Sequence, residues 1–356
     1  MYPPRPPARG DGSKRLLAYG HMEEDRMDLT IGKARGLQQI SNERGIFTIT
    51  ALDHRGSLKS ALAKATPDRS IGFGEVVEEK IRLARALAPH STAILLDPAY
   101  GVGPCVAAST IPPGCGVLIA LEESGYDETE AGRFTKVTPG WSAEKIKRAG
   151  AAALKVLLFY HPANEAAAHQ EAFVSEVAKA CMELDLAFLL EPMSYPLEPG
   201  LSKPDPAFAA TKHEVVLETV RRLGPLGADV LKLEFPDEPA YETDESRMRQ
   251  HVRALTEACP IPWVLLSEGK DYPTFQRQVE IACQEGASGF LGGRAIWQEA
   301  MTLAFPGDRD RFLAQVAVPR LRILSAIAEA FATPWRDRIR SPAAHAAAEG
   351  WHEVYS

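Results

Sequence analysis

The sequence has few cysteines and no pattern among them. Its 356 residues include five cysteines, which are odd in number and scattered without a CxxC pair. This usage argues against a disulfide framework and favours reduced thiols. No apolar run approaches the roughly 18 residues of a membrane span, and the first residues contain no apolar signal core. We therefore expect a cytoplasmic protein with no membrane partner.

The sequence also lacks an excess of positive charge and the common motifs for metals and dinucleotides. Its formal net charge of -7 argues against a nucleic-acid or anionic-membrane partner, while a local basic pocket for a phosphorylated metabolite stays open. The nine histidines show no HxH, HxxH or HExxH spacing, and only His54 stands at an expected strand end. This argues against zinc-dependent chemistry. The absence of GxGxxG after the first strand disfavours a doubly wound sheet, the structural alternative.

What the sequence contains is a repeated unit. Eight apolar runs recur, at 46–52, 93–96, 116–121, 154–160, 187–190, 230–233, 263–266 and 289–293. Segments with helical periodicity separate most of them, at 76–87, 142–149, 165–184, 212–223, 245–258 and 274–284. Continuous apolar runs suit parallel strands covered by helices, so the pattern predicts a single-domain (β/α)8 TIM barrel.

The remaining segments complete this prediction. A helix is expected over 29–41, and a strongly apolar helical pattern over 308–332 should close the barrel. The connection 124–140 carries no apolar run and is predicted to be an active-site loop. Residues 1–27 are rich in proline, glycine and charge and are predicted to be a flexible leader. This gives a barrel over 28–335 and a C-terminal tail over 336–356.

Polar residues stand where the apolar runs end, which in a barrel is the catalytic face. They are Asp53, Asp97, Glu122, Glu191, Glu234, Ser267 and Arg294. A simpler interpretation is that strand ends are where polar residues return to solvent. That interpretation explains one such residue well and the whole set poorly.

Two lysines lie deeper, inside their runs. Lys232 has apolar neighbours on both sides, and burial favours the neutral amine that can attack a carbonyl to form a Schiff base. The alternative is a lysine that reaches the surface or pairs with Glu234. Lys155 presents the same choice, and two inward lysines would favour each other's neutral form. Glu191, followed by Pro192, is a candidate general acid and base; its alternative role is a structural acceptor for a lysine.

The last two strand ends carry a pattern typical of a phosphate site. Ser267 and Gly269 follow the seventh run, and Gly292, Gly293 and Arg294 follow the eighth. Barrels often bind phosphate at these two loops through backbone N–H groups, and an arginine adds a charge-assisted clamp.

Taken together, the motifs resemble the class I tagatose-1,6-bisphosphate aldolase family, which includes the similar sulfofructose-1-phosphate aldolases. They are ALDHRGSL at 51–58, LLDPAYG at 95–101, ESGYD at 123–127, ALKVLLFY at 153–160, FLLEP at 188–192, DVLKLE at 229–234 and GFLGGRAIW at 289–297. The resemblance covers about 28–335 in the expected order. It implies a metal-independent aldolase, without cofactor, that forms a covalent Schiff base with a phosphorylated ketose.

The resemblance also implies roles for individual residues. Lys232 would form the Schiff base, Glu191 would shuttle protons, Lys155 would orient substrate and tune the nucleophile, and Asp53 would assist at substrate hydroxyls. The residues Ser267, Gly269, Gly292, Gly293 and Arg294 would hold one phosphate, with His54 and Arg55 as further substrate-binding residues. His54 departs from the glutamine that the family commonly has there. An imidazole can be charged, which bears on how the far end of the substrate is recognised.

The expected reaction is cleavage of tagatose 1,6-bisphosphate to dihydroxyacetone phosphate and glyceraldehyde 3-phosphate. The alternatives are a 6-deoxy-6-sulfofructose-1-phosphate aldolase and a non-catalytic sugar-phosphate sensor. Analogy with barrel aldolases favours a homo-oligomer.

Overall fold

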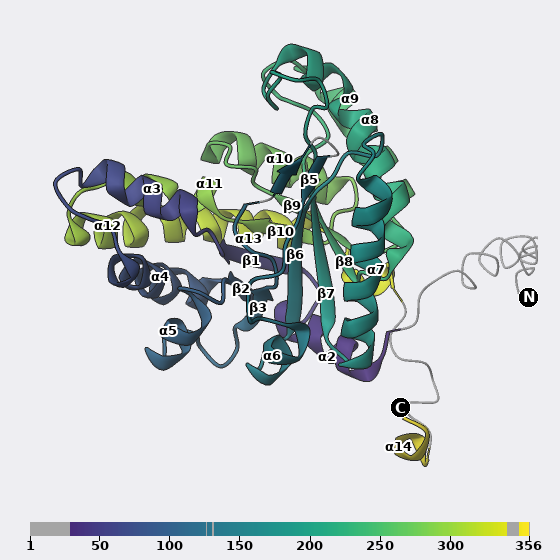
Figure 1. Ribbon diagram of the computed structural model, residues 1–356, viewed down its shortest axis with the longest axis horizontal. Helices are drawn as coiled ribbons and strands as arrows, with labels where there is room; N and C mark the ends of the chain where they lie inside the picture. The colour runs from purple at the N-terminus through teal and green to yellow at the C-terminus, as the bar shows by residue number, and fades with distance from the viewer. Residues whose placement is uncertain (1–28, 126, 130–131, 340–348, 356) are drawn as a thin grey trace, which may run out of the picture.

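The computed structural model describes residues 29–125, 127–129, 132–339 and 349–355, and in them eight parallel strands close into a barrel (Figure 1). The order around the barrel is β1-β10-β9-β8-β7-β6-β3-β2. The strands are β1 (Phe47–Leu52), β2 (Ala93–Leu96), β3 (Gly116–Ala120), β6 (Ala153–Phe159), β7 (Ala187–Met193), β8 (Val230–Leu233), β9 (Trp263–Leu266) and β10 (Gly289–Gly292). The predicted TIM-barrel fold is confirmed.

The strands form where the sequence places apolar runs because each strand is covered on both faces. All six residues of β1 and all four of β2, β8, β9 and β10 are buried. Each side chain that faces outward packs under a helix, and each that faces inward fills the barrel. Closure leaves none of the eight barrel strands as an edge strand.

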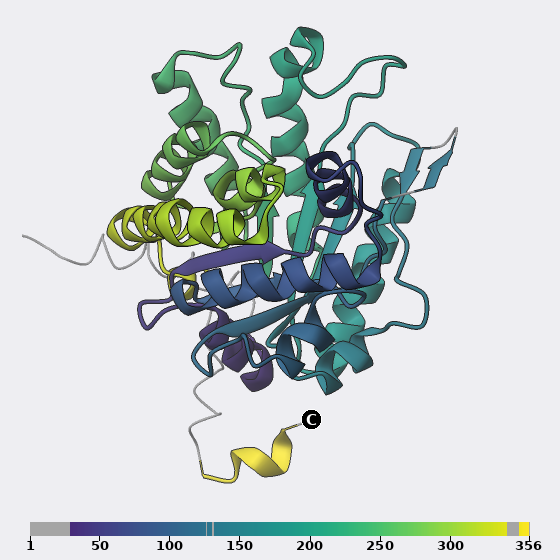
Figure 2. The ribbon, with the colours of Figure 1, turned by 90° about the vertical axis from the view of Figure 1, so that its left-hand side faces the viewer.

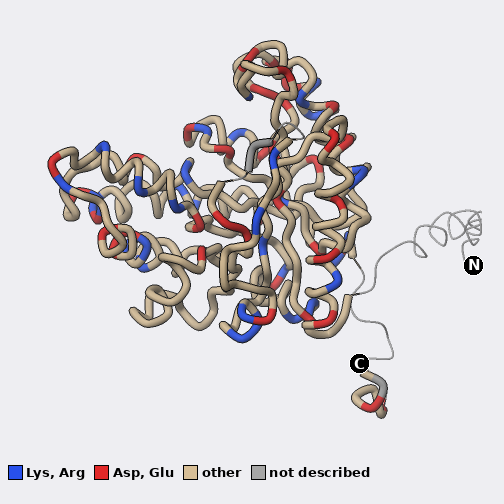
Figure 3. Tube along the Cα trace, in the orientation of Figure 1, with Lys and Arg blue, Asp and Glu red and all other residues tan. Residues whose placement is uncertain are grey.

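Helices surround the barrel, as the views in Figures 1 and 2 show. They are α2 (Ile31–Ile40), α3 (Gly56–Ala65), α4 (Phe73–Leu87), α5 (Val102–Ala107), α6 (Ala143–Arg148), α7 (Ala167–Glu183), α8 (Pro206–Leu223), α9 (Glu245–Ala258), α10 (Tyr272–Gln284), α11 (Arg294–Trp297), α12 (Pro306–Phe312), α13 (Val318–Phe331) and α14 (Trp351–Val354). Lysines, arginines and acidic residues are interspersed along them (Figure 3). Among the described residues, no helix is both long and apolar enough to span a membrane.

The two ends of the barrel differ. Helix α2 packs against β3, β6 and β7 at the end where the strands begin. The predicted closing helix over 308–332 is present as α12 and α13, joined by a π-helical turn at Leu313–Ala317. The segment after α13 returns to the core, where Trp335 and Ile339 are both buried. At the opposite end, where the strands finish, loops surround the barrel opening.

The connection 124–140 contains secondary structure that the sequence did not indicate. Strands β4 (Asp127–Thr129) and β5 (Gly132–Phe134) pair antiparallel in a small hairpin outside the barrel (Figure 2). Their residues are not an apolar run, because the hairpin is not part of the barrel core. The predicted leader lies outside the described residues, as does 340–348 of the tail.

Candidate active site

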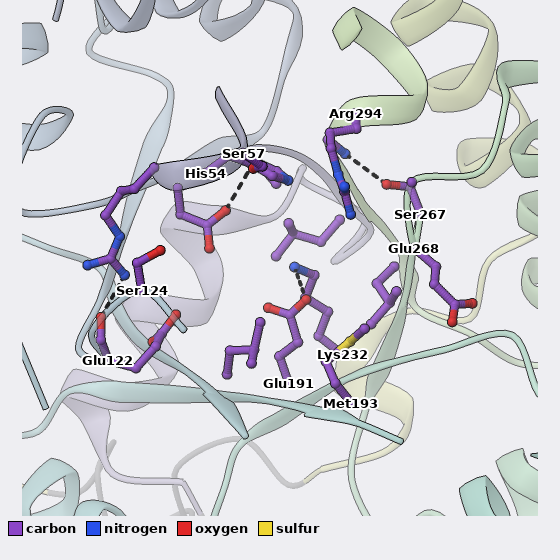
Figure 4. A pocket seen from close by; sticks show the side chains of 18 of the residues that line it. His54, Ser57, Glu122, Ser124, Glu191, Met193, Lys232, Ser267, Glu268 and Arg294 are labelled. Carbon is purple, nitrogen blue, oxygen red and sulfur yellow. Dashed lines mark hydrogen bonds and ion pairs between the residues drawn. The ribbon is translucent and has the colours of Figure 1, made fainter. Parts of the chain in front are cut away.

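A cavity of about 210 Å³ opens at the carboxyl ends of the barrel strands. Nine of the predicted site residues line it: Asp53, His54, Arg55, Glu191, Lys232, Ser267, Gly269, Gly293 and Arg294. Two predicted residues, Lys155 and Gly292, do not line it. Figure 4 shows Lys232 and Glu191 in the middle of this cavity, with Glu122 and Ser124 on one side and Ser267 and Arg294 on the other.

Strand register explains why the three central side chains meet. In the parallel pairing of β6 with β7, Leu157 lies beside Glu191 and Lys155 lies beside Leu189. Lys155 therefore starts two residues deeper than Glu191 on the inward face. Leu157 lines the cavity while Lys155, fully buried, reaches up from beneath it. On the other side of β7, Leu190 pairs with Leu231, which brings Lys232 level with Glu191.

Lys155 is surrounded by three carboxylates. Its Nζ lies 2.8 Å from Asp53 Oδ2, 2.7 Å from Glu122 Oε1 and 2.9 Å from Glu191 Oε2. Burial alone would lower the pKa of Lys155, but these three negative charges outweigh it and hold the pKa well above its ordinary value. Lys155 is therefore a permanent cation and unsuited to act as a neutral nucleophile.

The pKa values of two of the carboxylates around Lys155 are shifted in opposite directions. Burial would raise the pKa of Asp53, but the charges of Lys155 and Lys232 outweigh it and hold that pKa well below its usual range. For Glu122 burial prevails, and its pKa is raised in spite of the Lys155 ammonium. One carboxyl of the cluster is thus kept ionised and another is moved toward the neutral form, which separates their acid–base roles.

Lys232 has a different environment from Lys155. Its Nζ lies 2.6 Å from Glu191 Oε1 and faces the cavity, while the other oxygen of Glu191 belongs to Lys155 (Figure 4). A single carboxylate next to an amine that can reach a ligand provides a proton acceptor within hydrogen-bond distance. Of the two lysines, Lys232 is the one placed to react with a molecule in the cavity.

One side of the cavity is built to hold an anion. Ser267 Oγ accepts a hydrogen bond of 3.3 Å from the N–H of Gly293 and ties the ends of β9 and β10 together. The guanidinium of Arg294 projects into the cavity, and its buried Nε has no hydrogen-bond partner among the described residues. Gly269 has a φ of +74°, and a Cβ there would come within 3.0 Å of the Arg294 guanidinium. The glycine therefore makes room for the arginine.

The opposite side carries a second arginine. Arg55 Nη2 donates a 2.6 Å hydrogen bond to the carbonyl oxygen of Glu122, which fixes the guanidinium at the cavity wall beside Ser57 and Ser124. His54 packs edge-on against Trp297, with ring centroids 5.1 Å apart. Burial lowers the pKa of His54 to about 3, so this imidazole is neutral at ordinary pH.

Two of the polar strand ends belong to other contacts. Asp97 is fully buried in an ion pair with Lys80, at 2.7 Å, and Glu234 accepts hydrogen bonds from the backbone and hydroxyl of Ser194. Neither lines the cavity. Both are buried rather than returned to solvent, so each has a structural role that neither interpretation of the strand ends anticipated.

Sequence reasoning assigned no site role to two carboxylates that the structure places here. Glu122 contacts Lys155, and Glu268 lines the cavity next to Ser267. A signal was present for Glu122, because it ends the third run much as Glu191 ends the fifth. Glu268 gave no signal, since its partners Lys203 and Lys212 come from the segment between β7 and β8.

Comparison with known proteins identifies the family of this chain. The DeoC/LacD family aldolases match residues 47–299, which is most of the chain. The protein belongs to the DeoC/LacD aldolase family. It is therefore an aldolase, a carbon–carbon lyase.

Individual relatives sharpen the comparison. A tagatose 1,6-diphosphate aldolase of Listeria monocytogenes is 32% identical over 77% of this chain and 84% of its own length. One from Staphylococcus aureus is 30% identical over 86% and 98%. A solved archaeal fructose-1,6-bisphosphate aldolase, with its catalytic lysine bound to a carbinolamine intermediate, has a TM-score of 0.55 at 18% identity, covering 83% of this chain and 99% of its own. At that identity the likeness concerns the fold alone.

Proposed function

We propose that this protein is a class I aldolase that cleaves a ketose 1,6-bisphosphate, tagatose 1,6-bisphosphate first among them. The observation that carries the proposal is the 2.6 Å contact between Lys232 Nζ and Glu191 Oε1 inside the cavity. The names of the Listeria and Staphylococcus relatives support the choice of substrate.

The first step is formation of a Schiff base on Lys232. Glu191 accepts a proton from the Lys232 ammonium, and the neutral amine attacks the C2 carbonyl of the ketose to give a carbinolamine. Glu191 returns this proton to the departing hydroxyl, so that loss of water leaves an iminium ion and an ionised Glu191. Lys155 stays protonated, holds the second oxygen of Glu191 and so keeps that carboxylate in position.

The second step breaks the C3–C4 bond. Glu191, directly or through a water, removes the proton of the C4 hydroxyl, and the bonding electron pair moves into the iminium to give an enamine. Glyceraldehyde 3-phosphate leaves as the aldehyde. Protonation of the enamine at C3 and hydrolysis then release dihydroxyacetone phosphate and regenerate Lys232. Asp53, held ionised, accepts hydrogen bonds from substrate hydroxyls.

The two arginines set the orientation of the substrate. The phosphate of the dihydroxyacetone half would lie between Arg294, Ser267 and the backbone at Gly269 and Gly293. The group on C6 would point toward Arg55, across the cavity from Arg294. A bisphosphate satisfies both cations, and a sulfonate on C6 also carries the negative charge that Arg55 can bind.

Borohydride trapping tests the mechanism. Reduction in the presence of dihydroxyacetone phosphate should add one adduct mass to the peptide that contains Lys232, and Lys232→Met should abolish the adduct. Lys155→Arg, which keeps the charge, is the matched control and should still be labelled at Lys232. An adduct on residue 155 of the wild-type protein would contradict the assignment.

A retro-aldol panel tests the substrate. It should include tagatose and fructose bisphosphates, the sulfofructose phosphate and a 6-deoxy analogue. We expect tagatose 1,6-bisphosphate to give the highest kcat/KM. Faster cleavage of the sulfonate would identify the alternative substrate, and binding without turnover of any of the four would identify a sensor.

A further inference from the structure

Three side chains that could bind a metal ion converge on the outer side of the barrel, away from the cavity. They are His213 on α8, His251 on α9 and Asp237 in the loop that follows β8, and their candidate ligand atoms all lie within 4.8 Å of one another. None of the three lines the active-site cavity. The aldolase chemistry proposed above uses none of them.

The contacts within this triad show a site that is partly assembled. His251 Nδ1 lies 2.7 Å from Asp237 Oδ1, and the two imidazole rings are stacked with centroids 4.2 Å apart and planes 9° apart. Glu214 Oε1, 4.0 Å from His213 Nε2, adds negative charge nearby. Two imidazoles and two carboxylates thus lie close together, and the carboxylates make an environment that attracts a cation.

Asp237 gives a second observation that points to a ligand. Its side chain is buried, with the residue 4% exposed, and its Oδ2 has no hydrogen-bond partner within the described part of the chain. A buried carboxylate oxygen without a partner costs free energy unless something else satisfies it. The hydrogen bond to His251 accounts for only one of the two oxygens.

We propose that His213, Asp237 and His251 form a binding site for a divalent transition-metal ion of the zinc class. Two nitrogen ligands and one carboxylate oxygen match the ligands that zinc takes in proteins, whereas calcium and magnesium prefer oxygen alone. Three protein ligands leave the fourth tetrahedral position for a water.

The geometry requires a small adjustment on binding. Bond lengths near 2.1 Å place neighbouring tetrahedral ligand atoms about 3.4 Å apart. His251 Nδ1 and Asp237 Oδ1, now 2.7 Å apart, must therefore move apart. The ligand atoms that are farthest from each other must move closer. A metal lies in the plane of each imidazole that binds it, so one of the two parallel rings has to tilt. Both histidines are partly exposed on packed neighbouring helices, which leaves their rings room to turn.

The position gives the ion a structural role. It would tie α8 and α9 to the loop after β8, the strand that carries Lys232. Retro-aldol turnover would not require it.

Titration of the full-length, metal-stripped protein with Co²⁺ and then Zn²⁺ tests this site. We expect one Co²⁺ per chain, with a visible d–d band and no thiolate charge-transfer band, displaced by Zn²⁺. His213→Ala and His251→Ala should each weaken binding by more than about 100-fold, a larger loss than for a residue that only supports a ligand. Asp237→Asn, which keeps the shape of the side chain, should weaken it in the same direction.

The control is His90→Ala, a partly exposed histidine elsewhere on the molecule, which should bind the ion as the wild type does. Borohydride labelling of Lys232 in every variant reports that the barrel is intact. Zn²⁺ should raise the Tm of the wild type and not that of His251→Ala. Absence of stoichiometric Co²⁺ and Zn²⁺ binding, or binding unchanged in both His213→Ala and His251→Ala, would overturn the proposal.

Discussion

The segment around β8 holds two buried lysine–carboxylate pairs, one at each end, and they differ in whether a ligand can reach them. At the start, Asp229 pairs with Lys33 of α2, with both oxygens within 3.1 Å of Nζ, and Oδ2 also accepts the N–H of Phe188 at 2.8 Å. Toward the other end, Lys232 pairs with Glu191 at 2.6 Å. Both pairs are almost fully excluded from solvent. Only the second borders a cavity.

This difference shows that burial of a lysine does not by itself identify a nucleophile. In the Lys33 pair every hydrogen-bonding group of the carboxylate is used, so the pair connects α2 to the barrel and can do nothing else. In the Lys232 pair the carboxylate is shared with a second, permanently charged lysine, and the amine faces space for a ligand. A reactive lysine is therefore distinguished from a structural one by two features: its amine faces a cavity, and its carboxylate partner also contacts a second cation.

Exchanging each lysine for methionine should separate these two roles most strongly. Lys232→Met should lower kcat by at least about 10⁴-fold, since no amine remains to form the Schiff base. Its free energy of unfolding should fall by no more than about 2 kcal/mol, because Glu191 keeps its contact with Lys155. Lys33→Met should do the reverse, destabilising the fold by about 3–5 kcal/mol through the unpaired Asp229 while kcat per folded molecule stays near wild type.

Urea unfolding and steady-state retro-aldol assays on both variants check this exchange. A large loss of stability in Lys232→Met with retained turnover would reverse the comparison.

Removing Lys155 should have the next largest effect, and pH should reveal it. Lys155→Met leaves Asp53 and Glu122 without their cation and leaves Glu191 with Lys232 alone, against one unpaired carboxylate in Lys33→Met. We therefore expect a loss of about 5 kcal/mol at pH 7. Without the cation these carboxyls take up protons more readily in the folded than in the unfolded state. The deficit should therefore shrink as the pH falls from 7 to 5, and it should shrink more than in Lys33→Met.

In the wild type, Asp53 and Lys155 should change the stability little between pH 5 and 7, because both keep their charge in this range. The lowered pKa of Asp53 contributes stability above its ordinary value of 3.8 that is lost as the pH falls through the folded pKa. The raised pKa of Lys155 contributes stability below its ordinary value of 10.5 that is lost as the pH rises through the folded pKa. The cluster should thus stabilise most between these limits. Urea unfolding from pH 5 to 7 measures both proteins, and an equal pH dependence of the two methionine variants would contradict the three-carboxylate arrangement.

The elements that were predictable from the sequence are those with local signals. All eight barrel strands follow apolar runs, and α9 has the predicted bounds of Glu245–Ala258. Helix α3 was missed although Leu58 and Leu62 repeat at helical spacing, because its glycine start looks like a loop. The hairpin β4–β5 was missed because it lies outside the barrel sheet and its residues form no apolar run.

The site divides in the same way. Lys232, Glu191 and the Ser267 and Arg294 loops were found because each stands at a strand end or interrupts an apolar run. The partners of Lys155 were not predictable, since they depend on how far each strand is shifted against the next. The convergence of His213, Asp237 and His251 was hidden for a related reason, because helix packing brings together residues that show no metal motif in the sequence.

His54 should give the smallest effect, and it tests whether an ionisable side chain that lines the cavity keeps one charge state during turnover. Burial lowers its pKa to about 3, so it stays neutral from pH 5 to 8. A neutral glutamine should replace it well, and His54→Gln should keep kcat/KM within about threefold with a parallel pH profile over this range. Steady-state assays at half-unit pH steps measure this, with Asp53→Asn as the control that lowers activity. An acidic limb present in the wild type and absent from His54→Gln would show that the imidazole is protonated during turnover.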